Sequence, residues 1–189
     1  MTSPTITDRL VESTDIDGLL VIRLRQITDE RGTIREFARE STGASDFPGV
    51  GAWRQINVTE TEHGALRGLH GENMTKLVGV VHGAAFGAYV DTRPGSSSIG
   101  RVVTVPLAPG VQVLVPAGVC NGFQVTSAGG CQYLYCFDAE WVPGMAGVAV
   151  NPLDPALGIT WPVPVDPASR RQVSGKDAGL PTLAEVVAG

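Results

Sequence analysis

The chain of 189 residues is most simply one domain, residues 1–189, and it is long enough to bury a hydrophobic core. Its net charge of −5 and its pI near 5.1 argue against a nucleic-acid-binding surface, which requires a basic face. No run approaches the ~18 consecutive apolar residues of a membrane span, and the first residues lack the pattern of a secretory signal.

Cysteine usage and composition narrow the class further. The three cysteines, Cys120, Cys131 and Cys136, are an odd number without C-x-x-C spacing, which argues against a disulfide framework and against a zinc site. We therefore expect a reduced, cytoplasmic protein. With 43% hydrophobic residues, 24 Gly and 13 Pro, the composition favours a turn-rich β fold.

The first third of the chain predicts strands separated by turns. Residues 18–27 (GLLVIRLRQI) predict a strand, residues 29–32 a turn and residues 33–38 the returning strand. Residues 40–50 are rich in Ser, Gly and Pro and predict a loop. Residues 52–59 predict a strand on which Gln55 and Asn57 share one face. Such a pair lines a polar cavity or faces solvent, and the residues alone leave both interpretations open.

Residues 64–76 (GALRGLHGENMTK) bring Arg67, His70 and Lys76 close together in the sequence. Because strand side chains alternate, Arg67 is expected on one face with Leu69, and His70 on the other. A single His in an apolar strand is more often a core side chain satisfied by one hydrogen bond. The residues that accompany it later in the chain favour a functional site instead.

The rest of the chain predicts further short strands. Residues 77–83 and 84–91 predict two strands paired around a turn at 82–83, followed by strands at 101–107, 111–115, 122–126, 132–137 and 147–150. Many short strands that follow one another at such short intervals are typical of a β-sandwich or small barrel. Residues 151–167 contain five prolines and predict a wrapping arm, and residues 182–189 predict a short helix.

Several motifs resemble one enzyme family when they are taken together in this order. They are DERGTIREF, RQINVTETEHGALRGLH, KLVGVVHGAAFGAYVDTRPGSSSIG, VPAGVCNGF, DPALGITWP and SGKDAGLP. Over residues 15–182 the chain resembles the dTDP-4-dehydrorhamnose 3,5-epimerases. The resemblance implies an all-β double-stranded β-helix, a cupin-like jelly roll with a short C-terminal helical segment, which works as a homodimer without a metal. The chain has three histidines and no H-x-H pair, which agrees with a site that holds no metal.

The resemblance also implies the catalytic residues. His70, the His of RGLH, is the expected base, and Asp177 is its expected partner through the other ring nitrogen. Tyr135 is the expected acid, with Tyr133 as the neighbour that could be confused with it. Lys76 is expected near the substrate ketone, where a cation stabilises the enolate formed when a proton leaves C3 or C5. This chemistry needs no cofactor.

Substrate contacts follow from the same resemblance. The expected substrate is a nucleotide-diphosphate 4-keto-6-deoxyhexose, with dTDP as the expected nucleotide. The residues matched to its binding are Arg31 and Glu36 on a strand that crosses to the partner subunit, Arg67, Ser174 and Lys176 near the diphosphate, Trp141 over the sugar or base, and Gln55, Asn57 and Asn121 as polar groups.

The chain departs from the family at several positions. Asn121 stands where the family has a second His, Gly87 where it usually has an Asp, and Ile34 where an aromatic commonly lies. An amide cannot shuttle protons. We therefore expect a related or modified keto sugar and efficient inversion at one carbon only. The alternatives are a keto-sugar isomerase or dehydratase on the same fold, and a non-catalytic sugar-binding cupin.

Overall fold

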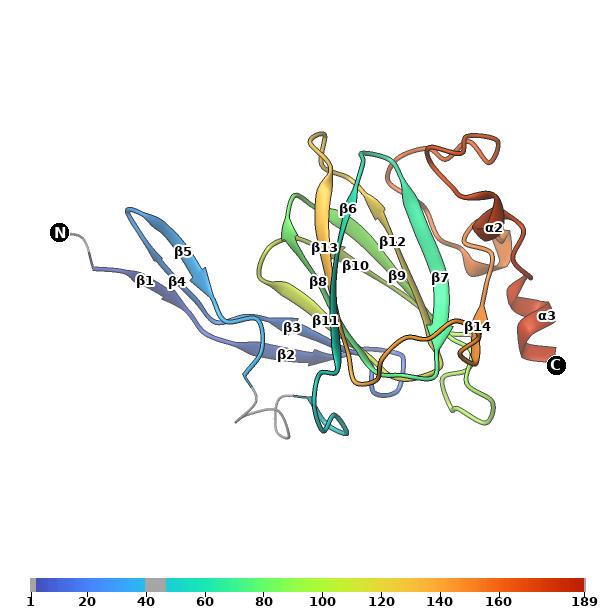
Figure 1. The fold of residues 1–189 in the computed structure, drawn as a ribbon, viewed down its shortest axis with the longest axis horizontal. Helices are drawn as coiled ribbons and strands as arrows, with labels where there is room; N and C mark the ends of the chain where they lie inside the picture. Colours follow the sequence, from blue (N-terminus) through green and yellow to red (C-terminus); the bar gives the residue numbers. More distant parts are fainter. Residues whose placement is uncertain (1–2, 40–46, 189) are drawn as a thin grey trace.

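The computed structural model describes residues 3–39 and 47–188, and it is built almost entirely from β-strands (Figure 1). The strands are β1 (Thr5–Thr7), β2 (Leu10–Ser13), β3 (Leu20–Arg23), β4 (Gln26–Asp29), β5 (Gly32–Arg35), β6 (Gln55–Thr61), β7 (Leu66–Glu72), β8 (Lys76–His82), β9 (Ala85–Asp91), β10 (Val102–Leu107), β11 (Val111–Val115), β12 (Val119–Val125), β13 (Cys131–Phe137) and β14 (Gly147–Ala149). The short helical elements are η2 (Pro155–Leu157), α2 (Gly175–Ala178) and α3 (Leu183–Ala188).

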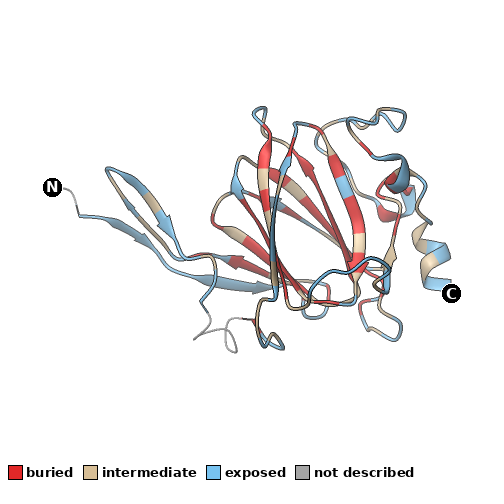
Figure 2. Ribbon diagram, viewed as in Figure 1, coloured by how far each residue is buried: buried red, intermediate tan, exposed pale blue. Residues whose placement is uncertain are grey.

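Two antiparallel sheets face each other and enclose the main core. One has the order β10-β9-β12-β7-β14 and the other the order β2-β3-β11-β8-β13-β6. Crossing connections between two facing sheets make a jelly roll, so the expected cupin-like all-β fold is confirmed. Figure 2 shows the buried residues concentrated in this barrel.

The core between the sheets is held by large side chains from both of them. Phe123 on β12 stacks on Tyr133 on β13 with ring centroids 3.9 Å apart and planes inclined by 6°. Tyr89 on β9 is completely buried in the same cluster. Stacked rings of this size fill the space between the sheets and set their separation.

The C-terminal part wraps the outer face of the five-stranded sheet, as expected. Its apolar side chains, including Leu157 and Trp161, pack with Leu69 and Val90 in a second cluster. The short helix predicted at 182–189 is present as α3. This arm also carries α2, which lies beside β7 (Figure 1).

The prediction that residues 77–83 and 84–91 pair with each other is wrong. β8 pairs with β11 and β13, whereas β9 pairs with β10 and β12 in the other sheet. Between them Gly83 has a φ of +81°, and a Cβ on it would lie 2.3 Å from the Gly130 carbonyl oxygen. The chain thus turns from one sheet into the other here, because a sandwich needs each sheet to cover the other's apolar face.

The N-terminal region also differs from the prediction. The expected strand at 18–27 is divided into β3 and β4, because the Leu24 N–H bonds to the Gly110 carbonyl at the barrel edge and the chain then leaves the barrel. β4 joins β1 and β5 in a separate three-stranded sheet, which extends away from the barrel (Figure 1). The returning strand ends at Arg35 rather than at residue 38, and the sequence did not predict β1 or β2. Most of the loop predicted at 40–50 lies outside the described residues.

Candidate active site

A pocket opens between the two sheets at the end of the barrel where β7 ends and β8 begins. β7 and β12 from one sheet and β8 and β13 from the other line it. The lining residues are Arg67, Gly68, His70, Glu72, Lys76, Asn121, Gly122, Phe123, Tyr135 and Phe137. It therefore unites His70, Lys76, Tyr135, Arg67 and Asn121, five of the residues expected to form the site.

A bulge in β7 brings Arg67 and His70 to the same face, so the prediction that they lie on opposite faces is wrong. Asn121 pairs with His70, but Phe123 pairs with Arg67, so three steps along β7 oppose two steps along β12. One extra residue reverses the alternation of side chains. Leu69 accordingly points outward into the cluster beneath the C-terminal arm, while both polar side chains face the pocket.

His70 is held by a carboxylate from the C-terminal arm. Its Nε2 lies 2.8 Å from Oδ1 of Asp177, which is buried in α2. Burial opposes the ionisation of Asp177, but the hydrogen bond and charge of His70 outweigh it and hold the pKa of the carboxyl below its ordinary value. The expected pairing of these two residues is therefore present in the structure.

Lys76 is almost fully buried, with 4% of its surface exposed. Its Nζ donates to the His70 carbonyl oxygen at 3.1 Å and to Asn121 Oδ1 at 2.7 Å, and it forms an ion pair with Glu72. Glu72 was not among the residues expected in the site. Its position two residues after His70, on the same face of a strand, is the signal that would have placed it in the pocket.

The structure distinguishes Tyr135 from Tyr133. Both lie on the inner face of β13, but Tyr133 is completely buried beneath Phe123, whereas Tyr135 lines the pocket. Burial raises the pKa of Tyr135 above its ordinary value, and the nearby Arg67 charge lowers it only in part. The phenol is therefore protonated at neutral pH.

Gln55, Asn57 and Trp141 form a polar group next to the pocket. Gln55 pairs with Phe137 and Asn57 with Tyr135 across the β6–β13 ladder, so both amides share a face with pocket residues. Gln55 donates to Asn57 Oδ1 at 3.2 Å and accepts from the Trp141 backbone N–H at 2.8 Å. These residues border the pocket without lining it.

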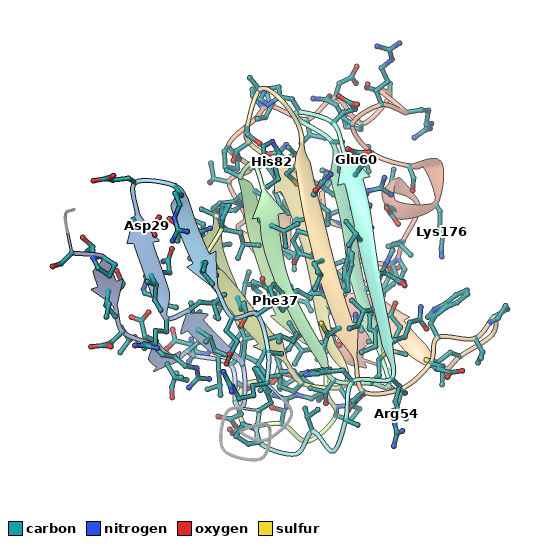
Figure 3. The ribbon with its side chains drawn as sticks, turned by 60° about the vertical axis from the view of Figure 1, so that its left-hand side comes forward. Asp29, Phe37, Arg54, Glu60, His82 and Lys176 are labelled. Atoms are coloured by element: carbon teal, nitrogen blue, oxygen red, sulfur yellow. The ribbon has the colours of Figure 1, made fainter. Side chains whose placement is uncertain are left out.

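The other matched residues do not line the pocket of their own chain. Arg31 pairs with Asp29 at the far end of the β4–β5 hairpin, where Figure 3 labels Asp29, and Glu36 pairs with Arg39. Ser174 caps α2 by accepting from the Asp177 N–H at 3.0 Å. Lys176 is exposed on the outside of α2 (Figure 3).

Among residues 3–39 and 47–188, which the structure describes, no group of three or more His, Cys, Asp or Glu side chains is arranged to hold a metal ion. None of the helices in this part of the chain is long and apolar enough to cross a membrane.

The chain is similar to known proteins of one enzyme family. The family model for dTDP-4-dehydrorhamnose 3,5-epimerase matches residues 13–185. This chain belongs to that family. A protein named RmlC homolog from Streptococcus pyogenes is 34% identical over 182 residues, covering 93% of this chain and 89% of the relative. A dTDP-4-dehydro-6-deoxyglucose 3-epimerase from a Streptomyces species is 33% identical, covering 83% and 80%.

Solved structures agree with this placement. A dTDP-6-deoxy-D-glucose-3,5-epimerase from Legionella pneumophila, solved in complex with dTDP-4-keto-L-rhamnose, superposes with a TM-score of 0.82 at 31% identity. The alignment covers 95% of this chain and 97% of that one. The expectations of a family member and of an isomerase of the epimerase type are thus confirmed.

Proposed function

We propose that this dTDP-4-dehydrorhamnose 3,5-epimerase family member inverts C3 of a dTDP-linked 4-keto-6-deoxyhexose, with C5 reacting slowly or not at all. The observation that carries the proposal is the arrangement of one pocket. It holds a carboxylate-bound imidazole on one sheet and a half-buried phenol on the facing sheet. Inversion needs a base and an acid on opposite faces of the reacting carbon.

The reaction balances with these groups alone. Nε2 of His70 is engaged by Asp177, so Nδ1 takes the proton from C3, and the electron pair delocalises onto the C4 oxygen as an enolate. The buried Lys76 ammonium stabilises that negative charge. The Tyr135 O–H then gives its proton to the opposite face of C3. Proton exchange with solvent restores the neutral imidazole and the phenol.

Single-carbon inversion is supported by the groups that surround the base. Asn121 accepts from Lys76 and has no titrating proton, so it adds no second acid or base. The Streptomyces relative that carries the name of a 3-epimerase supports C3 as the carbon that reacts.

Arg67 is the proposed contact for the diphosphate. Its Nε donates to the Thr61 hydroxyl at 3.0 Å, which orients the guanidinium at the pocket while leaving its terminal nitrogens for phosphate oxygens. Gln55, Asn57 and Trp141 next to the pocket are proposed to contact the sugar or base. Ser174 is proposed to act indirectly, because its side chain caps the helix α2 that carries Asp177. Lys176 is exposed on the same helix.

A homodimer that exchanges its N-terminal arm is part of the proposal. The arm carries exposed apolar side chains, with Ile34 72% exposed, and the outer face of β6 exposes Ile56 at 61% and Val58 at 57%. Exposed apolar side chains on both the arm and β6 are consistent with an interface between two copies of the chain. A two-fold interface would place Arg31 and Glu36 of each chain at the other's pocket.

Deuterium exchange tests the function directly. The protein is incubated in deuterated water with a dTDP-4-keto-6-deoxyhexose, and proton NMR follows C3 and C5 separately. We expect deuterium at C3 with inversion. Exchange with inversion at both carbons at equal rates would contradict the single-carbon proposal, and no exchange at either carbon would leave a sugar-binding protein.

A further inference from the structure

The Glu72 carboxylate is the one negatively charged side chain among the described residues that line the pocket, and the mechanism above does not use it. It lies two residues after His70 on the same strand and forms an ion pair with Lys76. Burial opposes its ionisation, but the charge and hydrogen bond of Lys76 outweigh burial and keep the pKa of Glu72 below its ordinary value. The pocket therefore holds an ionised carboxylate against a buried ammonium.

A buried ammonium without a counter-ion is costly, because desolvation favours its neutral form. The charged or titratable groups around Lys76 are Glu72, His70 and Arg67 on β7, Tyr135 on β13, Cys120 on β12 and Asp177 on α2. Asp177 is already engaged by His70. Glu72 is thus the carboxylate available to keep Lys76 charged.

Three oxygen atoms already surround the ammonium. Nζ donates to the His70 carbonyl and to the Asn121 side chain, and it forms an ion pair with Glu72. A substrate oxygen that binds Lys76 competes with these neighbours. Asn121 is buried and the His70 carbonyl belongs to the backbone, whereas the Glu72 side chain lines the pocket and is 23% exposed.

We infer that Glu72 is a positioning residue of this site. In the free enzyme its carboxylate keeps Lys76 charged and holds the ammonium in place. When substrate binds, the ketone oxygen of the substrate replaces Glu72 as the partner of Lys76. This inference rests on the proposed function, because the proposed function identifies the C4 ketone oxygen as the substrate atom that binds Lys76. It makes Glu72 the group that keeps the enolate-stabilising charge in place before substrate arrives.

NMR can observe Lys76 directly, since the chain contains two lysines, Lys76 and Lys176. Protein labelled with ¹³C at lysine Cε gives two signals, and Lys176→Arg assigns them. In Glu72→Gln we expect the Lys76 signal to titrate lower by about one pH unit or more, because the neighbouring anion is gone. The exposed Lys176 signal serves as the internal reference and stays unchanged.

Kinetics provide the second readout. The pH profile of kcat/KM reports the free enzyme and that of kcat the substrate complex. In Glu72→Gln we expect the alkaline limb of kcat/KM to move down by about the same one pH unit, and the limb of kcat to stay in place. Glu72→Asp should restore most of the kcat/KM profile. Glu62→Gln, at an exposed position in the turn between β6 and β7, is the matched control.

The outcomes separate this inference from the proposed function. The lysine titration needs no turnover, so it remains informative if the wild type exchanges no deuterium, the result that defeats the proposed function. With an active wild type, superimposable Lys76 titrations in wild type and Glu72→Gln would overturn the inference. A kcat limb that moves as far as that of kcat/KM would overturn the replacement of Glu72 by substrate. Glu72→Ala, which also removes the negative charge, answers the same questions if Glu72→Gln does not fold.

Discussion

Asp177 Oδ1 lies 2.8 Å from Nε2 of His70, although the two residues are 107 positions apart in the chain. The strand β7 places the imidazole and the short helix α2 places the carboxylate, so the pair exists only in the folded chain. His70→Ala should lower the rate of deuterium exchange about 10²- to 10⁴-fold, the usual contribution of a general base. Binding of dTDP, followed by calorimetry, should stay close to that of the wild type.

Asp177→Asn tests the orienting carboxylate separately. The amide keeps the size of the side chain but loses the charge that stabilises imidazolium and the preference for one ring tautomer. We expect a loss of about 10²-fold or more in kcat with little change in KM. A variant with unchanged kcat would show that His70 needs no orienting anion.

Tyr135→Phe should uncouple exchange from inversion. Without the phenol, His70 can return the proton that it took, so deuterium still enters at C3 but the configuration is retained. The measurement is NMR of the product's stereochemistry together with its deuterium content. Tyr133→Phe is the matched control, because it removes a hydroxyl from the neighbouring buried ring that does not line the pocket. Normal inversion by Tyr135→Phe would place the acid elsewhere.

Gly122→Ala should destabilise the site's backbone. A Cβ on Gly122 would lie 2.5 Å from the Arg67 carbonyl oxygen and 2.7 Å from a Leu69 methyl, so β7 and β12 would have to move apart. We expect a loss of about 2–3 kcal/mol in the free energy of unfolding, measured with urea. Gly129→Ala is the control, since nothing lies within 4 Å of its Cβ. Equal stability of the two variants would contradict the close approach of these strands.

Asp91→Asn should show a pH-dependent loss of stability. The completely buried Asp91 side chain bonds to Arg93, Ser96 and Ser98, and these contacts outweigh burial and hold the pKa of Asp91 well below its ordinary value. The stabilisation is therefore full above the unfolded-state value near 3.9 and is lost as pH falls toward the lower folded value.

At pH 7 we expect a cost of about 3 kcal/mol for Asp91→Asn, the size expected for breaking a buried ion pair. The difference from wild type should shrink steadily below pH 4. Asp15→Asn, at an exposed position, should change stability by less than about 0.5 kcal/mol at any pH. A difference between Asp91→Asn and wild type that does not vary with pH would contradict the role of the charge.

Mixing two impaired variants tests the exchanged arm. His70→Ala has an intact arm, and the double variant Arg31→Ala/Glu36→Ala has an intact base. If each arm completes the partner's pocket, mixed dimers contain one intact site and random pairing restores up to about a quarter of the wild-type activity. If the arm serves its own chain, the mixture shows only the average of the two variants. Light scattering of the active wild type should give the mass of a dimer.

The sequence predicted the strands of the barrel well because their apolar patterns are local. It failed where geometry depends on partners far away in the chain. The pairing of β8 with β9 looked plausible from the turn at 82–83, yet the need to cover two sheet faces sends these strands into different sheets. The break between β3 and β4 likewise follows from a contact with Gly110 that no local pattern contains.

In the site, too, local motifs were predicted correctly, whereas geometry that depends on distant parts of the chain was not. The motifs predicted His70, Lys76, Tyr135 and Asp177. In the structure the first three line one pocket, and Asp177 bonds to His70. The side on which Arg67 lies was predicted wrongly, because one extra residue in β7 becomes visible only when its pairing with β12 is known. Glu72 was missed because its significance depends on Lys76 reaching back to it from the next strand.

The stacked rings of Phe123 and Tyr133 have a consequence for substrate scope. Base and phenol stand on different sheets, so the gap available to a sugar ring follows from the thickness of the core between them. Replacing Tyr133 with a smaller apolar side chain would let the sheets approach without altering any residue that lines the pocket. Bulkier or slimmer sugars could thus be admitted by changes in the interior, and engineering of this enzyme can begin there rather than at the catalytic residues.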